Sequence, residues 1–147
     1  MATLIGIAIK PHHEQVMREL SEALLSCERG VEGDSRGKPG PRQVTVLSLA
    51  AWQAAGKELG IDFHWSQRRA NLLVDMLDLE QSSGAHIHIG DAILEVTGET
   101  DPCRRMEALH TGLFDALAKE WRGGVTCRVV KGGVLTVGET VMLNQPS

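Results

Sequence analysis

Glycine turns between short apolar segments restrict the fold of this chain more than any other feature. From residue 86 onward, Gly90-Asp91, Gly132-Gly133 and Gly138-Glu139 separate runs rich in Val, Ile and Leu. Each run is shorter than the ten or so residues that a helix in a globular domain usually needs. The pattern therefore predicts strands, with a hairpin at the first of these turns. The predicted strands cover residues 86–89, 92–97, 125–130, 134–137 and 140–143.

Three more strands and a short helix are expected in the N-terminal half. Ser48 is a suitable N-cap and Gly60 a suitable terminator for a helix over residues 49–58. Short segments rich in Val, Ile and Leu predict the strands, at residues 3–9, 42–47 and 71–74.

Two further helices are predicted from apolar spacing. After Pro11, apolar residues recur at spacings of three and four and predict a helix that stops near Cys27. Its apolar positions are Val16, Met17, Leu20, Ala23 and Leu24. Asp101 as N-cap and Pro102 at the first position begin a helix over 102–119. Its apolar stripe is Met106, Leu109, Leu113 and Leu117.

Many short strands with two or three helices predict a mainly β fold, either a barrel or a sandwich, with helices at its edge. The chain has 147 residues and no linker-like segment, so we expect one domain over residues 1–147. No apolar run reaches the roughly 18 residues that a membrane span needs. The net charge of −4 argues against nucleic acid as a partner. Three cysteines without a secretion signal indicate a cytoplasmic protein with free thiols.

Cys103 is the cysteine most suited to chemistry. As the second residue of a predicted helix, and followed by Arg104 and Arg105, it lies where thiolate is favoured over thiol. Thiolate is the form that reacts and binds metals. The alternative is a buried, inert thiol.

The other cysteines and the paired histidines are expected to be structural. Cys127 shares a strand face with Val125 and Val129, which predicts a core position. Cys27 is expected to close a helix. His86 and His88 share the opposite face of a strand from Ile87 and Ile89, which favours a solvated polar face over a metal site.

Arginines beside a glycine-rich loop indicate a site for an anionic ligand. Residues 30–41 form a loop with glycines, prolines and charged side chains, and Arg42 follows it directly. Arg68 and Arg69 precede Asn71 at another strand start. Guanidinium groups suit phosphate and other oxygen-rich ligands. Neither a phosphate-binding loop motif nor a dinucleotide fingerprint is present.

Six segments in order resemble the MOSC domain, the C-terminal domain of molybdenum cofactor sulfurases. They are Gly30-Val31-Glu32-Gly33-Asp34, Arg42-Gln43-Val44-Thr45, Arg68-Arg69-Ala70-Asn71, the hairpin at Gly90-Asp91, Pro102-Cys103-Arg104-Arg105-Met106, and the closing strands from Gly123 to Glu139. The resemblance implies a MOSC-type β-barrel with Greek-key-like strands and two to three peripheral helices. The chain would then be a small stand-alone member of that family.

The resemblance also implies a cofactor and a site. The implied cofactor is molybdenum cofactor (molybdopterin), a pterin with a dithiolene and a phosphate. Cys103 matches the cysteine that is expected to ligate molybdenum or to carry persulfide sulfur. Arg42, Arg69 and Asn71 are the implied contacts of the pterin and its phosphate, with Asp34 nearby.

The resemblance and the candidate residues allow three functions. The first is a molybdenum-dependent oxidoreductase that reduces N-hydroxylated substrates with electrons from a donor protein. The second is a sulfurtransferase that delivers persulfide sulfur from Cys103 to a metal cofactor, with a separate sulfur-donor protein as partner. The third is a non-catalytic module that binds an anionic ligand. A thiol of low pKa serves the first two equally, so composition does not choose between them.

Overall fold

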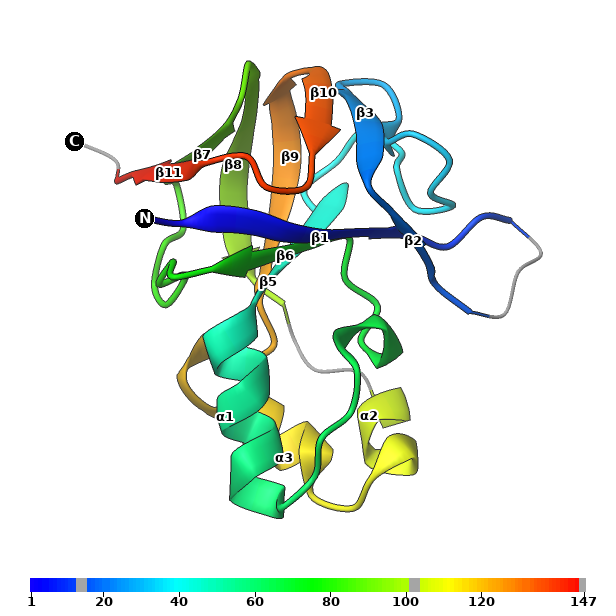
Figure 1. The fold of residues 1–147 in the computed structure, drawn as a ribbon, viewed down its shortest axis with the longest axis vertical. Coiled ribbons are helices and arrows are strands. Elements are labelled where there is room, and N and C mark those ends of the chain that lie inside the picture. Colours follow the sequence, from blue (N-terminus) through cyan, green and yellow to red (C-terminus); the bar gives the residue numbers. More distant parts are fainter. Residues whose placement is uncertain (13–15, 101–103, 146–147) are drawn as a thin grey trace.

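The protein consists of a curled β-sheet with helices packed at one end, as the computed structural model in Figure 1 shows. The structure describes residues 1–12, 16–100 and 104–145. The strands are β1 (Thr3–Ile9), β2 (Arg18–Leu20), β3 (Glu22–Ser26), β4 (Gly30–Val31), β5 (Val44–Ser48), β6 (Leu72–Asp75), β7 (His86–Ile89), β8 (Ala92–Glu99), β9 (Val125–Lys131), β10 (Gly133–Thr136) and β11 (Val141–Asn144). The α-helices are α1 (Leu49–Leu59), α2 (Arg104–Leu109) and α3 (Leu113–Ala118), and the short 3-10 turns are η1 (Trp65–Gln67) and η2 (Lys119–Trp121).

Eight strands form the main sheet in the order β11-β7-β8-β9-β5-β6-β1-β2. The sheet curls until β1 meets the segment that leads into β11. Thr3 bridges to Thr140, and the Leu4 N–H donates to the Glu139 carbonyl at 2.9 Å. A smaller sheet, β10-β3-β4, lies beside it. The expected barrel-like, mainly β fold with peripheral helices is confirmed.

The β5–α1–β6 unit places helix α1 outside the sheet. Strands β5 and β6 are parallel, and a parallel pair needs a crossover connection, which α1 provides. As predicted, Ser48 caps the helix by accepting a hydrogen bond from the Ala51 N–H at 3.4 Å. Gly60 ends it with a φ of 70°, a left-handed conformation that suits glycine.

Two apolar clusters stabilise the fold. The first, the barrel interior, is enclosed by the curled sheet and contains Leu4, Ile7, Leu72, Ile87, Leu94 and Cys127 among others. The second, the helix layer, packs Trp52, Trp65, Met106, Leu113 and Leu117 between the sheet and the helices. Cys127 is fully buried between Val125 and Val129, as predicted. Ile87 and Ile89 are buried too, whereas His86 and His88 are partly exposed on the other face of β7.

The helix predicted after Pro11 is wrong. In the described part of that segment the chain forms β2 and β3 instead. Along β3 the side chains alternate, with Ala23 and Leu25 buried and Leu24 49% exposed. The exposed Leu24 hid this alternation and produced a false helical spacing. Cys27 therefore follows a strand, is exposed, and donates from Sγ to the Val130 carbonyl at 3.5 Å.

The single helix predicted over 102–119 is two helices. Gly112, with a φ of 90°, separates α2 from α3 and breaks the helical path. Met106, Leu113 and Leu117 of the predicted stripe are nevertheless buried together in the helix layer. The predicted helix start, Asp101 and Pro102, lies outside the described residues, as does Cys103. All helices in the described ranges fall short of the length and apolarity that a bilayer-spanning segment needs.

Candidate functional site

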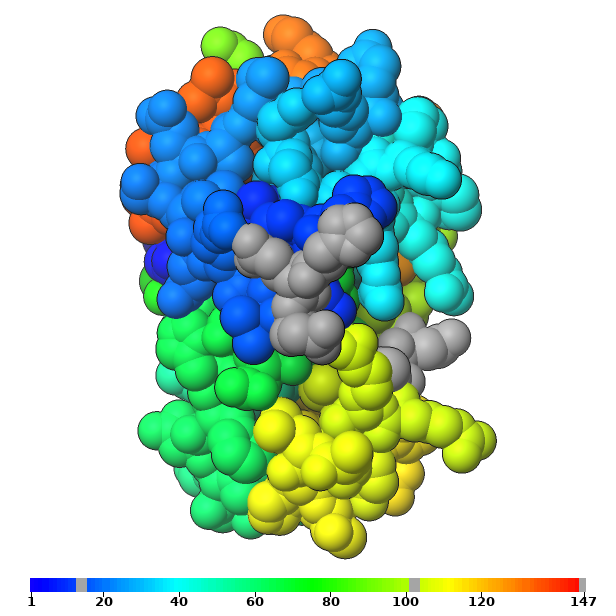
Figure 2. Space-filling view, turned by 90° about the vertical axis from the view of Figure 1, so that its right-hand side faces the viewer, coloured from blue at the N-terminus to red at the C-terminus, as the bar shows by residue number. Residues whose placement is uncertain are grey.

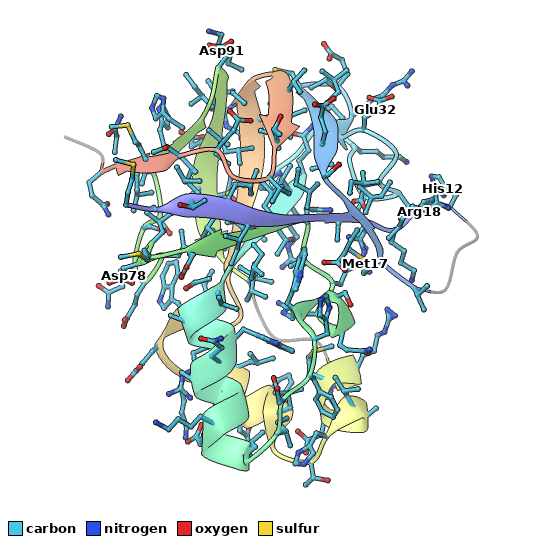
Figure 3. All side chains as sticks on the ribbon, viewed as in Figure 1. His12, Met17, Arg18, Glu32, Asp78 and Asp91 are labelled. Atoms are coloured by element: carbon cyan, nitrogen blue, oxygen red, sulfur yellow. The ribbon has the colours of Figure 1, made fainter. Side chains whose placement is uncertain are left out.

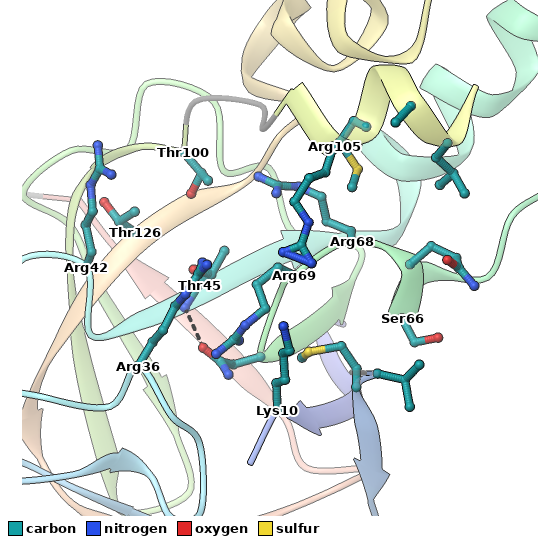
Figure 4. Close-up of a pocket in the computed structure, with 17 residues that line it drawn as sticks. Lys10, Arg36, Arg42, Thr45, Ser66, Arg68, Arg69, Thr100, Arg105 and Thr126 are labelled. Carbon is teal, nitrogen blue, oxygen red and sulfur yellow. Dashed lines mark hydrogen bonds between the residues drawn. The ribbon is translucent and has the colours of Figure 1, made fainter. Parts of the chain in front are cut away.

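A cavity of about 920 Å³ lies where the ends of several strands face helix α2 (Figure 4). Six cationic side chains line it, and its described lining contains neither Asp nor Glu. These cations are Lys10, Arg36, Arg42, Arg68, Arg69 and Arg105. Such a concentration of positive charge in a chain of net charge −4 favours an anionic ligand.

The cavity wall is assembled from segments far apart in the sequence. Lys10 follows β1, and Arg36 belongs to the glycine-rich loop. Arg42 lies between that loop and β5, and Arg69 lies between η1 and β6. In Figure 2 the segment after residue 15 (blue), the loop before β5 (cyan) and α2 (yellow) occupy one face of the molecule. In Figure 3 the carboxylates of Asp78 and Asp91 lie well away from Met17, another lining residue.

The carboxylate of Asp34 holds part of this wall in place through hydrogen bonds. It accepts two bonds from Nη2 of Arg69, at 2.8 and 2.9 Å. It also accepts the backbone N–H of Lys10 at 2.8 Å and that of Arg36 at 3.3 Å. The Asp34 side chain is 1% exposed and that of Arg69 is 11% exposed. Asp34 thus ties together three segments that each carry a cation into the cavity.

Arg69 retains unused hydrogen-bonding capacity. Its Nε is buried and has no hydrogen-bond partner among the described residues. A buried donor without an acceptor costs free energy, so an acceptor supplied by a ligand would be stabilising there.

Asn71 holds the strands at the cavity wall. Its Oδ1 accepts the Thr45 N–H at 3.0 Å, the bond drawn as a dashed line in Figure 4. Its Nδ2 donates to the Ala8 carbonyl at 3.2 Å. The side chain is therefore engaged with β5 and β1, although it lies at the cavity surface. Its implied contact with a cofactor stays a prediction.

The other arginines of the lining differ in burial. Arg68 is 3% exposed and donates from Nη2 to the Gly123 carbonyl at 2.9 Å. Arg42 and Arg105 are exposed. Lys10 was not predicted at the site. It directly follows β1, whereas Arg42 was singled out because it precedes a strand, so a search for cations at both ends of the strands would have identified Lys10.

Cys103 lies outside the described residues, and the chain on both sides of it reaches the cavity. Thr100 and Arg105 both line the wall. The hydroxyl of Thr100 is buried without a hydrogen-bond partner in the described part of the chain. Of the other two cysteines, burial raises the pKa of the Cys127 thiol far above its ordinary value, so that thiol stays protonated and unreactive. No cluster of three or more His, Cys, Asp or Glu suited to a metal is found within the described ranges.

Comparisons with known proteins agree with this architecture. A sequence model of the MOSC domain matches residues 33–142. Among solved structures, the YuaD protein from Bacillus subtilis aligns over 100% of this chain and 98% of its own, with 19% identity and a TM-score of 0.80. YiiM from Geobacillus stearothermophilus aligns over 97% of this chain and 75% of its own, with 15% identity and a TM-score of 0.77. YiiM from Escherichia coli aligns over 99% and 71%, with 15% identity and a TM-score of 0.69. No curated protein matches the sequence significantly.

Proposed function

Because the chain belongs to the MOSC domain family, we propose that it binds molybdenum cofactor in the arginine-lined cavity and uses Cys103 as the reactive cysteine. The observation that carries this proposal is the cavity wall itself. Six cationic side chains line the cavity, and no Asp or Glu is among its described lining residues.

The residues of the wall fit the phosphate of this cofactor. Arg42 is exposed toward the cavity and is available for a bidentate contact with phosphate. Arg69 is held in place by Asp34 and keeps one buried N–H without an acceptor. The amide of Asn71 joins β5 to β1 at the cavity wall and so holds these two strands at a fixed distance. We assign phosphate binding to Arg42 and Arg69, and positioning to Asp34 and Asn71.

The proposed role of Cys103 depends on positive charge near its thiol. Arg105 lines the cavity two residues after Cys103, and a nearby guanidinium favours thiolate. Thiolate is a soft ligand of the kind that molybdenum accepts. When bound, the cofactor would supply two-electron oxygen-atom chemistry, so the proposed activity is reduction of N-hydroxylated substrates with electrons from a separate donor protein.

The proposal is tested by metal and pterin analysis of protein purified from a host that makes the cofactor. We expect stoichiometric molybdenum and pterin in the wild type and loss of molybdenum in Cys103→Ser. Cys27→Ser is the matched control, because Cys27 is exposed and does not line the cavity. Arg42→Gln is expected to lower pterin content, whereas Lys131→Gln, an exposed cation outside the cavity, is expected to leave it unchanged.

Other outcomes would assign another function. A persulfide on Cys103 by mass spectrometry, in protein without molybdenum, would contradict cofactor binding and support the sulfurtransferase. Unchanged metal and sulfur content in Cys103→Ser would remove the cysteine from the chemistry and leave a module that binds an anionic ligand.

A further inference from the structure

The cavity lining contains apolar side chains as well as cations. Five apolar residues belong to it, from the segment that leads into β2 and from helix α2. They are Val16, Met17, Met106, Ala108 and Leu109. Val16 is 72% exposed, which is unusual for a β-branched apolar side chain.

This apolar part of the lining is continuous with the helix layer. Met106 is 5% exposed within that cluster, and Met17 and Leu109 pack against it while remaining partly accessible. The accessible surfaces of Met17 and Leu109 therefore form the outer boundary of an ordered core, with Met106 directly beneath. Apolar surface held open in a ligand-sized cavity is stabilised when a ligand removes it from water.

We propose that Val16, Met17, Met106 and Leu109 form an apolar subsite that binds the uncharged aromatic or aliphatic part of a small-molecule substrate. The charge pattern of the cavity selects this occupant. The cations attract an anionic group, whereas the apolar side chains are stabilised by an apolar body and not by a charged group, which would lose its hydration there. The cavity therefore suits an anionic group and an apolar body bound together, in one molecule or in two. In terms of the proposed function, on which this inference rests, the phosphate of the cofactor occupies the cations and the body of the substrate lies on the apolar subsite.

The methionines make the subsite tolerant in shape. Met17 and Met106 have unbranched, polarizable side chains that adapt to differently shaped apolar groups and make favourable contacts with aromatic rings. We therefore infer a preference for apolar, particularly aromatic, substrates as a class, rather than for one substrate.

The test uses the full chain from a host that cannot synthesise the cofactor, so that both the cations and the apolar subsite are accessible. Calorimetric titration compares 1-naphthyl phosphate with glycerol phosphate. Both are phosphate monoesters, and they differ chiefly in the body attached to the phosphate. We expect 1-naphthyl phosphate to bind about tenfold tighter or more, because its ring would bury apolar surface against the subsite.

Variants assign that preference to the subsite. Val16→Ser and Met17→Gln are expected to remove most of the naphthyl preference and to leave the affinity for glycerol phosphate within about twofold. Met142→Gln, at a methionine that is 59% exposed outside the cavity, is the matched control and should keep the full preference. Val16 is largely exposed, so its variant tests the subsite even where Met17→Gln impairs folding.

The inference is overturned if the two esters bind equally, if neither binds, or if the preference survives both subsite variants. Its failure is distinguishable from failure of the proposed function. Molybdenum binding without a naphthyl preference would contradict the subsite alone. A naphthyl preference in a protein that never binds molybdenum would contradict cofactor binding alone.

Discussion

The barrel interior and the cavity wall are built from the same strands but present opposite kinds of side chain. Along β1, Leu4 and Ile7 point into the barrel interior, and Lys10, just past the end of the strand, lines the cavity. Around β6 the same division holds, since Leu72 is in the interior and Arg69 lies before the strand begins. Residues that stabilise the fold therefore lie within these strands, whereas the candidate ligand-binding residues lie just beyond the strand ends.

This division has a physical reason. Inside the curled sheet a charged side chain would lose its hydration without gaining a partner, which is costly. At the strand ends, loop carboxylates and carbonyls supply partners, as Asp34 does for Arg69. Strand ends are therefore where this fold tolerates a concentration of cations.

The largest expected effect on stability is in the barrel interior. Leu94 is fully buried on β8, and Leu94→Ala is expected to lower the free energy of unfolding by about 4 kcal/mol, from lost apolar burial and the cavity left behind. Urea denaturation measures this loss, and Met142→Ala on β11 is the exposed control. The affinity for inorganic phosphate should stay unchanged under conditions where the variant is folded. A change in that affinity would show that the two regions are coupled.

A smaller loss is expected at the cavity wall. Asp34→Asn leaves the Arg69 guanidinium, 11% exposed, without its carboxylate, which is expected to cost about 3 kcal/mol. It also weakens the anchors of the backbone at Lys10 and Arg36. The rise in Tm that inorganic phosphate produces is therefore expected to be smaller in the variant than in the wild type.

The control for that variant is an exposed acid in the same loop region. Glu32 pairs with Arg29 at 2.8 Å, but the two side chains are 40% and 73% exposed, so Glu32→Gln is expected to cost less than about 1 kcal/mol. A phosphate-induced rise in Tm that is equal or larger in Asp34→Asn would show that Asp34 only neutralises Arg69 and does not position the wall.

The sequence predicts the barrel interior better than the cavity wall. Strands β7, β8 and β9 alternate or run apolar between glycine turns, because burial inside the sheet selects side chains at every inward position. In β3 the sequence does not show the alternation of apolar and polar residues that predicts a strand, since Leu24 is apolar yet exposed and its neighbours Ala23 and Leu25 are buried. The prediction for the segment before β2 fails for a related reason, because Val16 and Met17 line a cavity instead of a helix face.

The cavity wall depends on contacts that no local pattern encodes. Arg69 and Asp34 are 35 positions apart, and nothing in either segment specifies that they pair. Asn71 was expected to contact a cofactor, yet its amide joins β5 to β1. Strand starts beside a glycine-rich loop indicated Arg42, Arg68 and Arg69, but they did not indicate Lys10. The tertiary structure was needed to show which residues position others. The part of the site at Cys103 lies outside the described residues and stays a prediction.

The smallest expected effect lies outside both regions, where Glu58 of α1 joins the end of α3. Its carboxylate accepts a hydrogen bond from Lys119 Nζ and another from Arg122 Nη1 at 2.8 Å. The Lys119 ammonium, followed by the Arg122 guanidinium, lowers the pKa of Glu58 below its ordinary value. A carboxyl with a lowered pKa stabilises the fold above its ordinary pKa, and this contribution is lost as the pH falls through the lowered value.

Glu58→Gln should therefore lower Tm slightly at neutral pH, and the difference from wild type should vanish once the pH falls below the lowered pKa of Glu58. Differential scanning calorimetry across the acidic range measures this convergence. Glu80→Gln is the control, because Glu80 is exposed and has no ion-pair partner in the described part of the chain. The Glu58 carboxylate is 36% exposed, whereas that of Asp34 is 1% exposed, so the contribution of the Glu58 cluster should remain well below that of the Asp34–Arg69 pair. A loss as large as that of Asp34→Asn, or one independent of pH, would mean that burial is not what distinguishes the cavity wall from an ordinary charged surface.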